Sequence, residues 1–285
     1  MSTLNVGNIN TNSVNDGQLA GFRNRIINGN FALNQRGYSS GSSLSSGVYA
    51  HDRWKAGASD GDYSFTQSAN GCTITIAATK TLVQVIEDAN IEGGTYVLSW
   101  TGTAQARYGV DTATPSGAYA DSPITITGQS ASTTMSVEFD DGTLSNVQLE
   151  LGSTATTFEQ RPYGTELALC QRYFQRVDAP TDSDFIFPGQ AYQTSSVVVG
   201  VRFPAEMRAA PTITLGTAGT GPGAIYAAKG DSNVPTTAGT VAAGGISVGG
   251  FLALFTSWTS AFTVGAASHW CARGPCNVYK ADAEL

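Results

Sequence analysis

Short segments that alternate between apolar and polar residues are the feature that most constrains this sequence. The segments "TITIAA", "TYVLSW" and "MSVEF" alternate over five or six residues, and turn residues such as "SANG", "EGG" and "DDG" separate strand-like segments. An extended strand points successive side chains to opposite faces, so a period of two predicts a strand that is buried on one face. Many short strands at this spacing are typical of a β-sandwich or a β-barrel.

The alternation predicts a series of strands in the first half of the chain. They are Ile26–Leu33, Tyr63–Gln67, Cys72–Ala77, Leu82–Ile86, Thr95–Thr101, Ala104–Val110, Ser122–Thr127, Thr133–Glu138 and Thr143–Leu151. Charged residues make up 13% of the chain, against about 25% in a typical soluble protein. Small residues such as Gly, Ser, Thr, Ala and Asn replace them, which suits strands joined by glycine-rich turns and argues against a helical enzyme.

A second strand-rich region occupies the C-terminal part of the sequence. Its strand-like segments include "DFIFPG", "SSVVVGVRF", "PTITLG", "GGISVGGFLALF" and "NVYKADAEL", with glycine-rich connections such as "GTAGTGPGA" between them. No internal repeat of fixed period is found, so neither a β-helix nor a propeller is indicated. A chain of 285 residues can bury more than one core, and we expect a second β-sandwich-like domain here.

The pattern changes inside "QLELGSTATTFEQRPYGTELALCQRYF", which runs from Gln148 to Phe174. Its first part alternates like a last strand, and "EQRPYG" has the composition of an exit turn. Thr165 is a candidate N-cap and Glu166 suits a first helical turn. An apolar stripe at helical spacing follows, so we expect a helix that ends before "DAPTDSD". The stripe consists of Leu167, Cys170, Phe174 and Val177. The period shift indicates a domain boundary, and the Glu, Arg, Tyr and Cys of this stretch are interpreted as a junction rather than a site.

Four parts are therefore predicted in this all-β chain. They are an extended N-terminal arm at 1–21, a jelly-roll sandwich at 22–163, a short connector helix at 164–178 and a C-terminal β domain at 179–285. The arm is rich in Asn, Ser and Gly and cannot bury enough apolar surface to order itself. We expect it to order against another subunit, with a disordered tail as the alternative.

Net charge and apolar runs limit the partners. The formal net charge is −7 and no Lys/Arg run occurs, so the clustered positive charge that nucleic-acid binding requires is missing. No basic segment followed by an apolar one opens the chain, and apolar stretches such as "GISVGGFLALF" are too short to cross a bilayer. We expect a soluble protein that folds in a cytoplasm and does not insert into a membrane.

The residues of known catalytic motifs are missing. The only histidines are His51 and His269, neither lies in a recognisable nucleophile setting, and no G-x-S-x-G sequence is present. We expect no enzymatic activity and no cofactor.

Two short motifs raise the question of a metal. In "HWCARGPC", Cys271 and Cys276 lie near His269, but this set is one ligand short of a zinc site. Free or hairpin-linked cysteines are the favoured interpretation. In "FDDGT", Asp140 and Asp141 are weak calcium candidates, and a hairpin turn is favoured over an ion site.

Aromatic residues are more informative about a possible ligand site than these metal motifs. An aromatic ring on a sandwich surface can stack on the apolar face of a sugar while polar neighbours bind its hydroxyls. Trp54 and Trp100 are interpreted as core residues of their strands. Tyr38 and Tyr49 lie in a Ser/Gly-rich loop and are the candidates for ligand contacts.

Three stretches carry a resemblance to a known group of proteins. "NRIINGNFALNQRG" followed by "DRWKA", then "VQLELGSTATTFEQRPYGTELALCQRYF", and more weakly the terminal "DAEL", resemble virion proteins of tailed bacteriophages. These are fibre-like appendage proteins with a carbohydrate-binding-module-like jelly roll, and the resemblance covers about residues 22–176. It implies a jelly roll, a connecting helix, a distal β domain, homotrimeric assembly and attachment to other virion proteins by the N-terminal arm.

The leading hypothesis is a non-enzymatic structural protein of the virion, assembled in the host cytoplasm. It would be a short tail fibre or receptor-binding protein whose C-terminal domain presents loops to a host-surface glycan. The helical stripe is then expected to face other subunits or the domain core. The alternative is a head fibre or capsid-decorating protein. A glycan-degrading spike is a third hypothesis, and it requires an acid pair in a cleft that the sequence does not specifically indicate.

Overall fold

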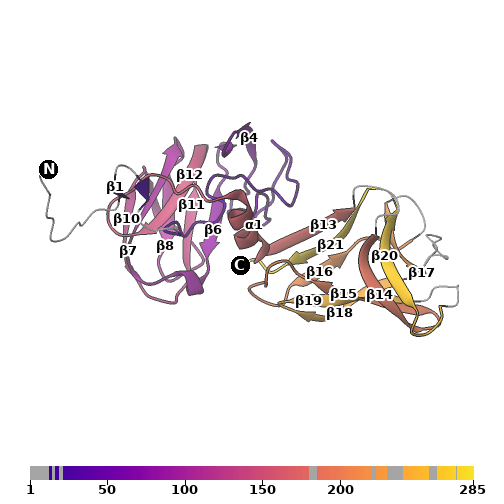
Figure 1. Cartoon of the computed structure of the whole chain (residues 1–285). Coiled ribbons are helices and arrows are strands. Elements are labelled where there is room, and N and C mark those ends of the chain that lie inside the picture. Colours follow the sequence, from indigo (N-terminus) through magenta and orange to yellow (C-terminus); the bar gives the residue numbers. More distant parts are fainter. Residues whose placement is uncertain are drawn as a thin grey trace, which may run out of the picture. The chain divides into compact units, whose positions relative to one another are not determined.

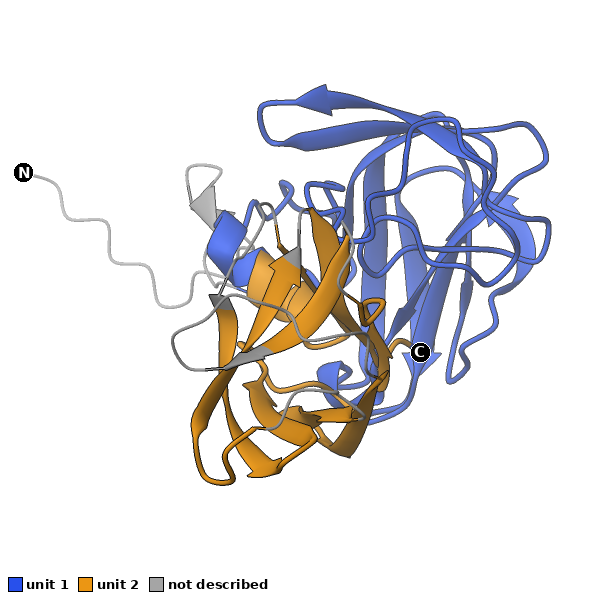
Figure 2. Cartoon of the chain, turned by 90° about the vertical axis from the view of Figure 1, so that its right-hand side faces the viewer, with its two compact units in different colours: residues 1–166, 285 blue, residues 167–284 orange. Residues whose placement is uncertain are grey.

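The structure is a computed structural model of the whole chain. It describes residues 13–14, 17–18, 22–179, 185–219, 223–229, 240–256, 262–273 and 275–285. The chain divides into two compact units, residues 1–166 together with Leu285 and residues 167–284 (Figure 2). Most of the predicted N-terminal arm lies outside the described residues, apart from the backbone of two short paired strands, β1 (Ser13–Val14) and β2 (Gly17–Gln18).

The first unit is built from two five-stranded antiparallel sheets (Figure 1). One sheet has the order β10-β7-β12-β5-β4 and the other the order β3-β6-β11-β8-β9. The strands are β3 (Lys55–Ala56), β4 (Tyr63–Ser68), β5 (Gly71–Ile76), β6 (Leu82–Ile86), β7 (Gly94–Gly102), β8 (Ala106–Gly109), β9 (Ser116–Ala120), β10 (Ile124–Gln129), β11 (Met135–Phe139) and β12 (Gly142–Leu151). A 3₁₀ turn, η1 (Asp88–Asn90), lies between β6 and β7. The predicted all-β class and sandwich architecture are confirmed.

A single aromatic-rich core lies between these two sheets. Trp54 and Trp100 are buried, as predicted, and their rings lie edge-on to Phe139 at centroid distances of 5.9 and 5.1 Å. The indole nitrogen of Trp54 donates to the carbonyl of Asn28 at 3.0 Å, so the polar atom of this fully buried ring is satisfied. The loop that contains Asn28 is therefore anchored to the core.

The strand predicted at Ile26–Leu33 is wrong, because this segment is a bent loop folded onto the core. Asn28 and Phe31 have φ angles of +58° and +53°, which a strand does not allow. The Asn28 side chain stabilises the bend, since its amide donates to the carbonyls of Leu33 and Asp52 at 2.8 and 3.1 Å. Ile26 and Phe31 are nevertheless fully buried. The apolar pattern that suggested a strand thus reflects burial of a loop.

The second unit holds a three-stranded sheet, β13-β21-β16, and a six-stranded sheet, β17-β20-β14-β15-β19-β18. A separate core contains Phe251 and Tyr279, whose rings from the two sheets lie 5.2 Å apart. The strands are β13 (Phe174–Ala179), β14 (Phe185–Gln193), β15 (Ser196–Arg202), β16 (Thr212–Leu215), β17 (Ala224–Lys229), β18 (Thr240–Ser247), β19 (Gly250–Thr256), β20 (Ala267–Arg273) and β21 (Cys276–Asp282).

The connector helix is shorter than predicted. Helix α1 spans Tyr163–Gln171, a turn closed by a hydrogen bond from Tyr173 N to Cys170 O follows, and Phe174–Ala179 is strand β13. Phe174 and Val177 therefore lie on a strand, and the helix predicted through residue 178 is wrong there. Their spacing fits a period of 3.6, but β21 pairs with this segment from Phe174 opposite Asp282 to Ala179 opposite Cys276. Sheet pairing overrides the helical pattern.

Two of the four stripe residues are buried and two are half-buried. Cys170 and Phe174 are almost completely buried, whereas Leu167 and Val177 keep intermediate exposure. The role of these four residues at an oligomer interface stays a prediction. In the described part of the chain, no helix is long and apolar enough to cross a membrane.

Candidate functional site

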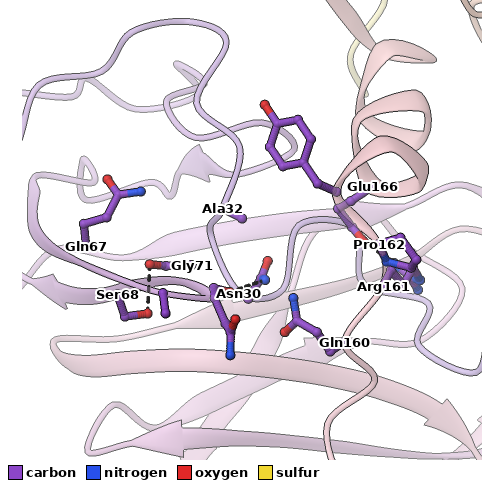
Figure 3. Close-up of a pocket in the computed structure, with 12 residues that line it drawn as sticks. Asn30, Ala32, Gln67, Ser68, Gly71, Gln160, Arg161, Pro162 and Glu166 are labelled. Carbon is purple, nitrogen blue, oxygen red and sulfur yellow. Dashed lines mark hydrogen bonds and ion pairs between the residues drawn. The ribbon is translucent and has the colours of Figure 1, made fainter.

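The first unit contains a cavity of about 510 Å³ that is lined mostly by polar residues and presents both polar and apolar atoms. It lies beside the turn between β4 and β5, and its other walls are the loop before β3 and the segment that leads into α1 (Figure 3). We call it the amide cavity, because four side-chain amides line it. They belong to Asn30, Gln67, Asn70 and Gln160.

A smaller cavity of about 280 Å³ adjoins the amide cavity. Five residues line both spaces, namely Asn30, Ser68, Asn70, Gly71 and Gln160. We call the smaller space the side cavity. Its remaining walls include Thr73 of β5 and Asn146 of β12. The amide cavity alone lies in the size range of about 300–1,000 Å³ that is typical of small-molecule sites.

The β4–β5 turn forms one wall, and it is fastened to the Asn30 loop. Asn30 donates from its amide to Asn70 O at 2.6 Å and accepts at its carbonyl from Cys72 N at 2.8 Å. Gly71 has a φ of +142°, and a Cβ built there would lie 2.1 Å from Asn30 O. Only glycine allows this close approach, so the turn and the loop form one rigid wall.

The opposite wall is held by the buried Arg161. Its guanidinium forms an ion pair with Glu166 at 3.1 Å and donates to the carbonyls of Ile26, at 3.2 Å, and Asn24. Glu166 also accepts from Asn28 N at 2.5 Å. Arg161 and Glu166 both line the amide cavity, but they pair with each other, and Arg161 also lies 3.8 Å from the buried carboxylate of Glu159. The pair therefore fixes the start of α1 against the Asn24–Asn28 loop instead of offering a free charge to a ligand.

Several polar groups at the rim remain available. Among the described residues, the side-chain amides of Gln67, Asn70 and Gln160 form no hydrogen bond, and all three residues are exposed. Figure 3 shows Gln160 extending from the segment before the helix toward Asn30. Tyr163, the first residue of α1, keeps 65% of its surface exposed. Each amide supplies two donors and one acceptor, and the tyrosine supplies a flat apolar ring.

Neither predicted ligand residue lines these cavities. Tyr38 is half-buried with its ring 4.5 Å from that of Tyr63, and its hydroxyl donates to Ser42 O at 2.5 Å. Burial raises the pKa of Tyr38. The half-buried Tyr49 ring lies near two cations, the guanidinium carbon of Arg36 at 5.2 Å from its centroid and Lys55 Nζ at 5.7 Å. The Tyr49 hydroxyl donates to Leu285 O at 2.5 Å. Contact of either tyrosine with a ligand stays a prediction.

The weak calcium candidates lie at a connection between the two sheets. Asp140 and Asp141 join β11 of one sheet to β12 of the other, so the favoured hairpin is wrong. Asp140 accepts from Gln105 N at 2.6 Å, and burial followed by the nearby Asp141 charge raises its pKa. In the part of the chain that the structure describes, no group of three or more His, Cys, Asp or Glu residues is arranged to hold a metal ion.

The cysteines and histidines of interest also have structural surroundings. Cys271 is buried in β20, Cys276 is half-buried in β21 of the other sheet, and neither forms a disulfide. Burial raises the pKa of Cys271 to about 11 and lowers that of His269. His51 is 1% exposed in the first core, where its Nδ1 lies 2.5 Å from the hydroxyl of Tyr63. Burial lowers the pKa of His51 to about 4, so this ring is neutral at pH 7.

No local sequence pattern predicts the amide cavity. Its residues come from three segments separated by dozens of positions, around Asn30, Asn70 and Gln160, and single Asn and Gln residues are ordinary in turns. The sequence predicts a junction at "EQRPYG" and the helix that follows it. Arg161 of this stretch and Glu166 of the helix hold the segment to the Asn24–Asn28 loop, while Gln160 and Tyr163 line the cavity.

Comparison with known proteins adds little. No family model matches the chain, and no curated protein matches it. Two solved structures of discoidin II from Dictyostelium discoideum are similar to it. The recombinant native form is 12% identical over 87% of this chain and 89% of that chain, with a TM-score of 0.21. The wild-type form is 11% identical over 91% of both chains, with a TM-score of 0.20. At these TM-scores the likeness carries no conclusion about the site.

Proposed function

We propose that this chain is a non-enzymatic binding protein that recognises a carbohydrate through the amide cavity of its jelly roll. One observation carries the proposal: unpaired side-chain amides surround a cavity whose rim bears an exposed tyrosine and whose charged residues neutralise each other. The cavity lies in the first unit. We therefore assign recognition to the jelly roll rather than to the loops of the C-terminal domain.

This combination matches the chemistry of a sugar. A sugar ring carries hydroxyl groups that both donate and accept, and an amide can meet one hydroxyl with its N–H and another with its oxygen. The apolar face of the sugar ring is stabilised by leaving water when it stacks on an aromatic side chain such as Tyr163. A small ligand held by few contacts binds weakly, so several copies of the site must act together for tight attachment.

The biological setting follows from the resemblance of residues 22–176 to phage appendage proteins. We place the chain in the virion as a short tail fibre or receptor-binding protein, attached to other virion proteins by residues 1–21 and directed at a host-surface glycan. A head fibre or capsid-decorating protein is the alternative. Homotrimeric assembly would multiply the weak contacts of one cavity, and light scattering should then give about three times the chain mass of 29.6 kDa. A mass of one chain contradicts the trimer, and the position of the protein in a virion map separates tail from head.

A glycan array with the full chain tests the binding function. We expect binding to a defined set of glycans, and Tyr163→Ala or Gln160→Ala should weaken it about tenfold, the equivalent of roughly 1.4 kcal/mol for one lost stacking or polar contact. Tyr192→Ala is the matched control, because Tyr192 is 41% exposed and lies in the second unit. A blank array together with a blank host-cell adsorption assay contradicts the proposal. Unchanged binding by both cavity variants removes the amide cavity as the site, and release of reducing ends favours a glycan-degrading spike.

A further inference from the structure

The amide cavity and the side cavity are neighbouring spaces that share part of their lining. Both are lined by the β4–β5 turn, by Asn30 and by Gln160. A ligand long enough to pass these shared residues can occupy both spaces. The amide of Asn30 is held against Asn70 O at the shared boundary, which gives this boundary a fixed shape.

The far end of the side cavity is formed by a bulge in strand β12. The pairing of β12 with β7 shifts register between Ser145 and Gln148, and the pairing of β12 with β5 ends at Leu144 opposite Ile74. Asn146 lies in this interruption with a φ of +50°, a conformation that Asn adopts more readily than most residues. A bulge re-aims the side chain that it carries. Asn146 is exposed, and its amide forms no hydrogen bond among the described residues.

The charges of the two spaces are also informative. Arg161 and Glu166 are the charged residues that line the amide cavity, and they pair with each other at 3.1 Å. The side cavity is lined by uncharged residues, among them Thr73, Ser145 and Asn146. An anionic sugar would have to lose part of its hydration without gaining a free cation, which is unfavourable.

We infer that the site takes a neutral oligosaccharide of at least two sugar units, one in the amide cavity beside Tyr163 and the next in the side cavity against Asn146. This inference rests on the proposed function. It adds to that function a minimum ligand length of two sugar units and a preference for uncharged sugars. Asn146 acts as the specificity-determining contact for the second unit.

Calorimetric titration of the full chain with a sugar panel tests the inference. The panel contains glucose, galactose and N-acetylglucosamine, their 1,4-linked di- and trisaccharides, and the matching uronic acids. For at least one sugar type, we expect the disaccharide to bind about tenfold more tightly than the monosaccharide, because the second unit gains one or two hydrogen bonds. We expect the corresponding uronic acid to bind at least about tenfold more weakly than the neutral sugar.

Asn146→Gly is the decisive variant. Glycine accepts the positive φ of this position, so the substitution removes the amide and keeps the bulge. It should abolish the advantage of the disaccharide and leave monosaccharide affinity unchanged. Asn277→Gly in the second unit, where Asn277 is also exposed, should change neither affinity. Equal melting temperatures of Asn146→Gly and the parent chain establish that the fold is kept.

The outcomes separate the inference from the function on which it rests. Monosaccharide binding with no gain for the disaccharide, or a gain that Asn146→Gly leaves intact, overturns the two-unit site while carbohydrate binding stands. Equal affinity for uronic acids overturns the neutral selectivity. A panel in which no sugar binds, together with a blank glycan array, overturns both.

Discussion

Arg161 connects the Asn24–Ile26 loop to the start of helix α1 at one wall of the amide cavity. Its side chain is 6% exposed, and its planar guanidinium reaches Glu166 and two backbone carbonyls at once. Lysine has one compact charge and cannot match this fork of donors. Because Arg161 binds the Asn24–Ile26 backbone on one side and the start of α1 on the other, it positions Gln160 and Tyr163 without offering its own charge to a ligand.

His51 leads to a prediction about the pH dependence of stability. Burial lowers its folded-state pKa to about 4, whereas an unfolded chain has a histidine pKa near 6.5. Between these two values the unfolded chain takes up a proton that the folded chain does not. The free energy of unfolding should therefore fall by about 3 kcal/mol as the pH drops from about 6.5 to about 4, and this contribution should level off below that.

Urea unfolding at a series of pH values measures this loss, with His51→Gln for comparison. The variant should be less stable at pH 7, because Tyr63 loses its imidazole partner, but its stability should change less over the same pH interval. Burial also lowers the pKa of His269. This residue therefore contributes a loss of stability of the same sign at low pH, and the His51→Gln variant keeps that contribution. If both proteins show the same pH slope, His51 does not titrate in this way.

At the scale of elements, the alternation of apolar and polar residues predicted most strands of the first unit. The strand predicted at Leu82–Ile86 coincides with β6, and the one at Tyr63–Gln67 differs from β4 by one residue. Alternation failed where burial had another cause. The loop at Ile26–Leu33 is apolar because it covers the core. The predicted helix ran too far because Phe174 and Val177 fit a helical spacing of apolar residues although they lie on strand β13. The strand with which a segment pairs decides between helix and strand here, and a single sequence does not show which segments pair.

A cross-linking prediction distinguishes strand β13 from the helix that the sequence indicated. Arg176 lies directly opposite Lys280 in the pairing of β13 with β21. Cα atoms of such pairs are about 4.5–5.5 Å apart, within the range that a disulfide spans. The double variant Arg176→Cys with Lys280→Cys should form this disulfide on mild oxidation, and peptide mapping by mass spectrometry detects it.

The matched control uses the next strand of the same sheet. Thr214 pairs with Lys280 from the other side, so Arg176 and Thr214 are two strands apart, about 9–10 Å. Arg176→Cys with Thr214→Cys should remain reduced under the same conditions. A helix through residue 178 would place residue 176 outside this ladder, and then the first pair would fail to cross-link in preference to the second.

At the scale of the whole molecule, the sequence predicted the two β-rich units but not the cavity in the first of them. The existence of two β-rich regions followed from composition and turn spacing, since each region has enough apolar residues for its own core. The cavity did not follow, because Asn30, Asn70 and Gln160 lie far apart in the sequence and come together only in the folded unit. A site assembled from single amides on distant loops has no local sequence pattern, in contrast to a metal motif or a nucleophile elbow.

The separate cores predict two distinguishable unfolding transitions. Ile126 and Ile225 are both fully buried, the first in β10 of the first unit and the second in β17 of the second. Truncating a buried isoleucine to alanine costs about 2–5 kcal/mol, which lowers the melting temperature of a domain of this size by roughly 10 °C. In calorimetry, Ile126→Ala should lower one transition and Ile225→Ala the other.

A bound sugar stabilises the unit that holds it, so a saturating oligosaccharide should raise the transition that Ile126→Ala lowers and leave the second transition in place. A single transition lowered equally by both variants would contradict two independent cores, and a sugar that raises the second transition instead would move the binding site out of the jelly roll.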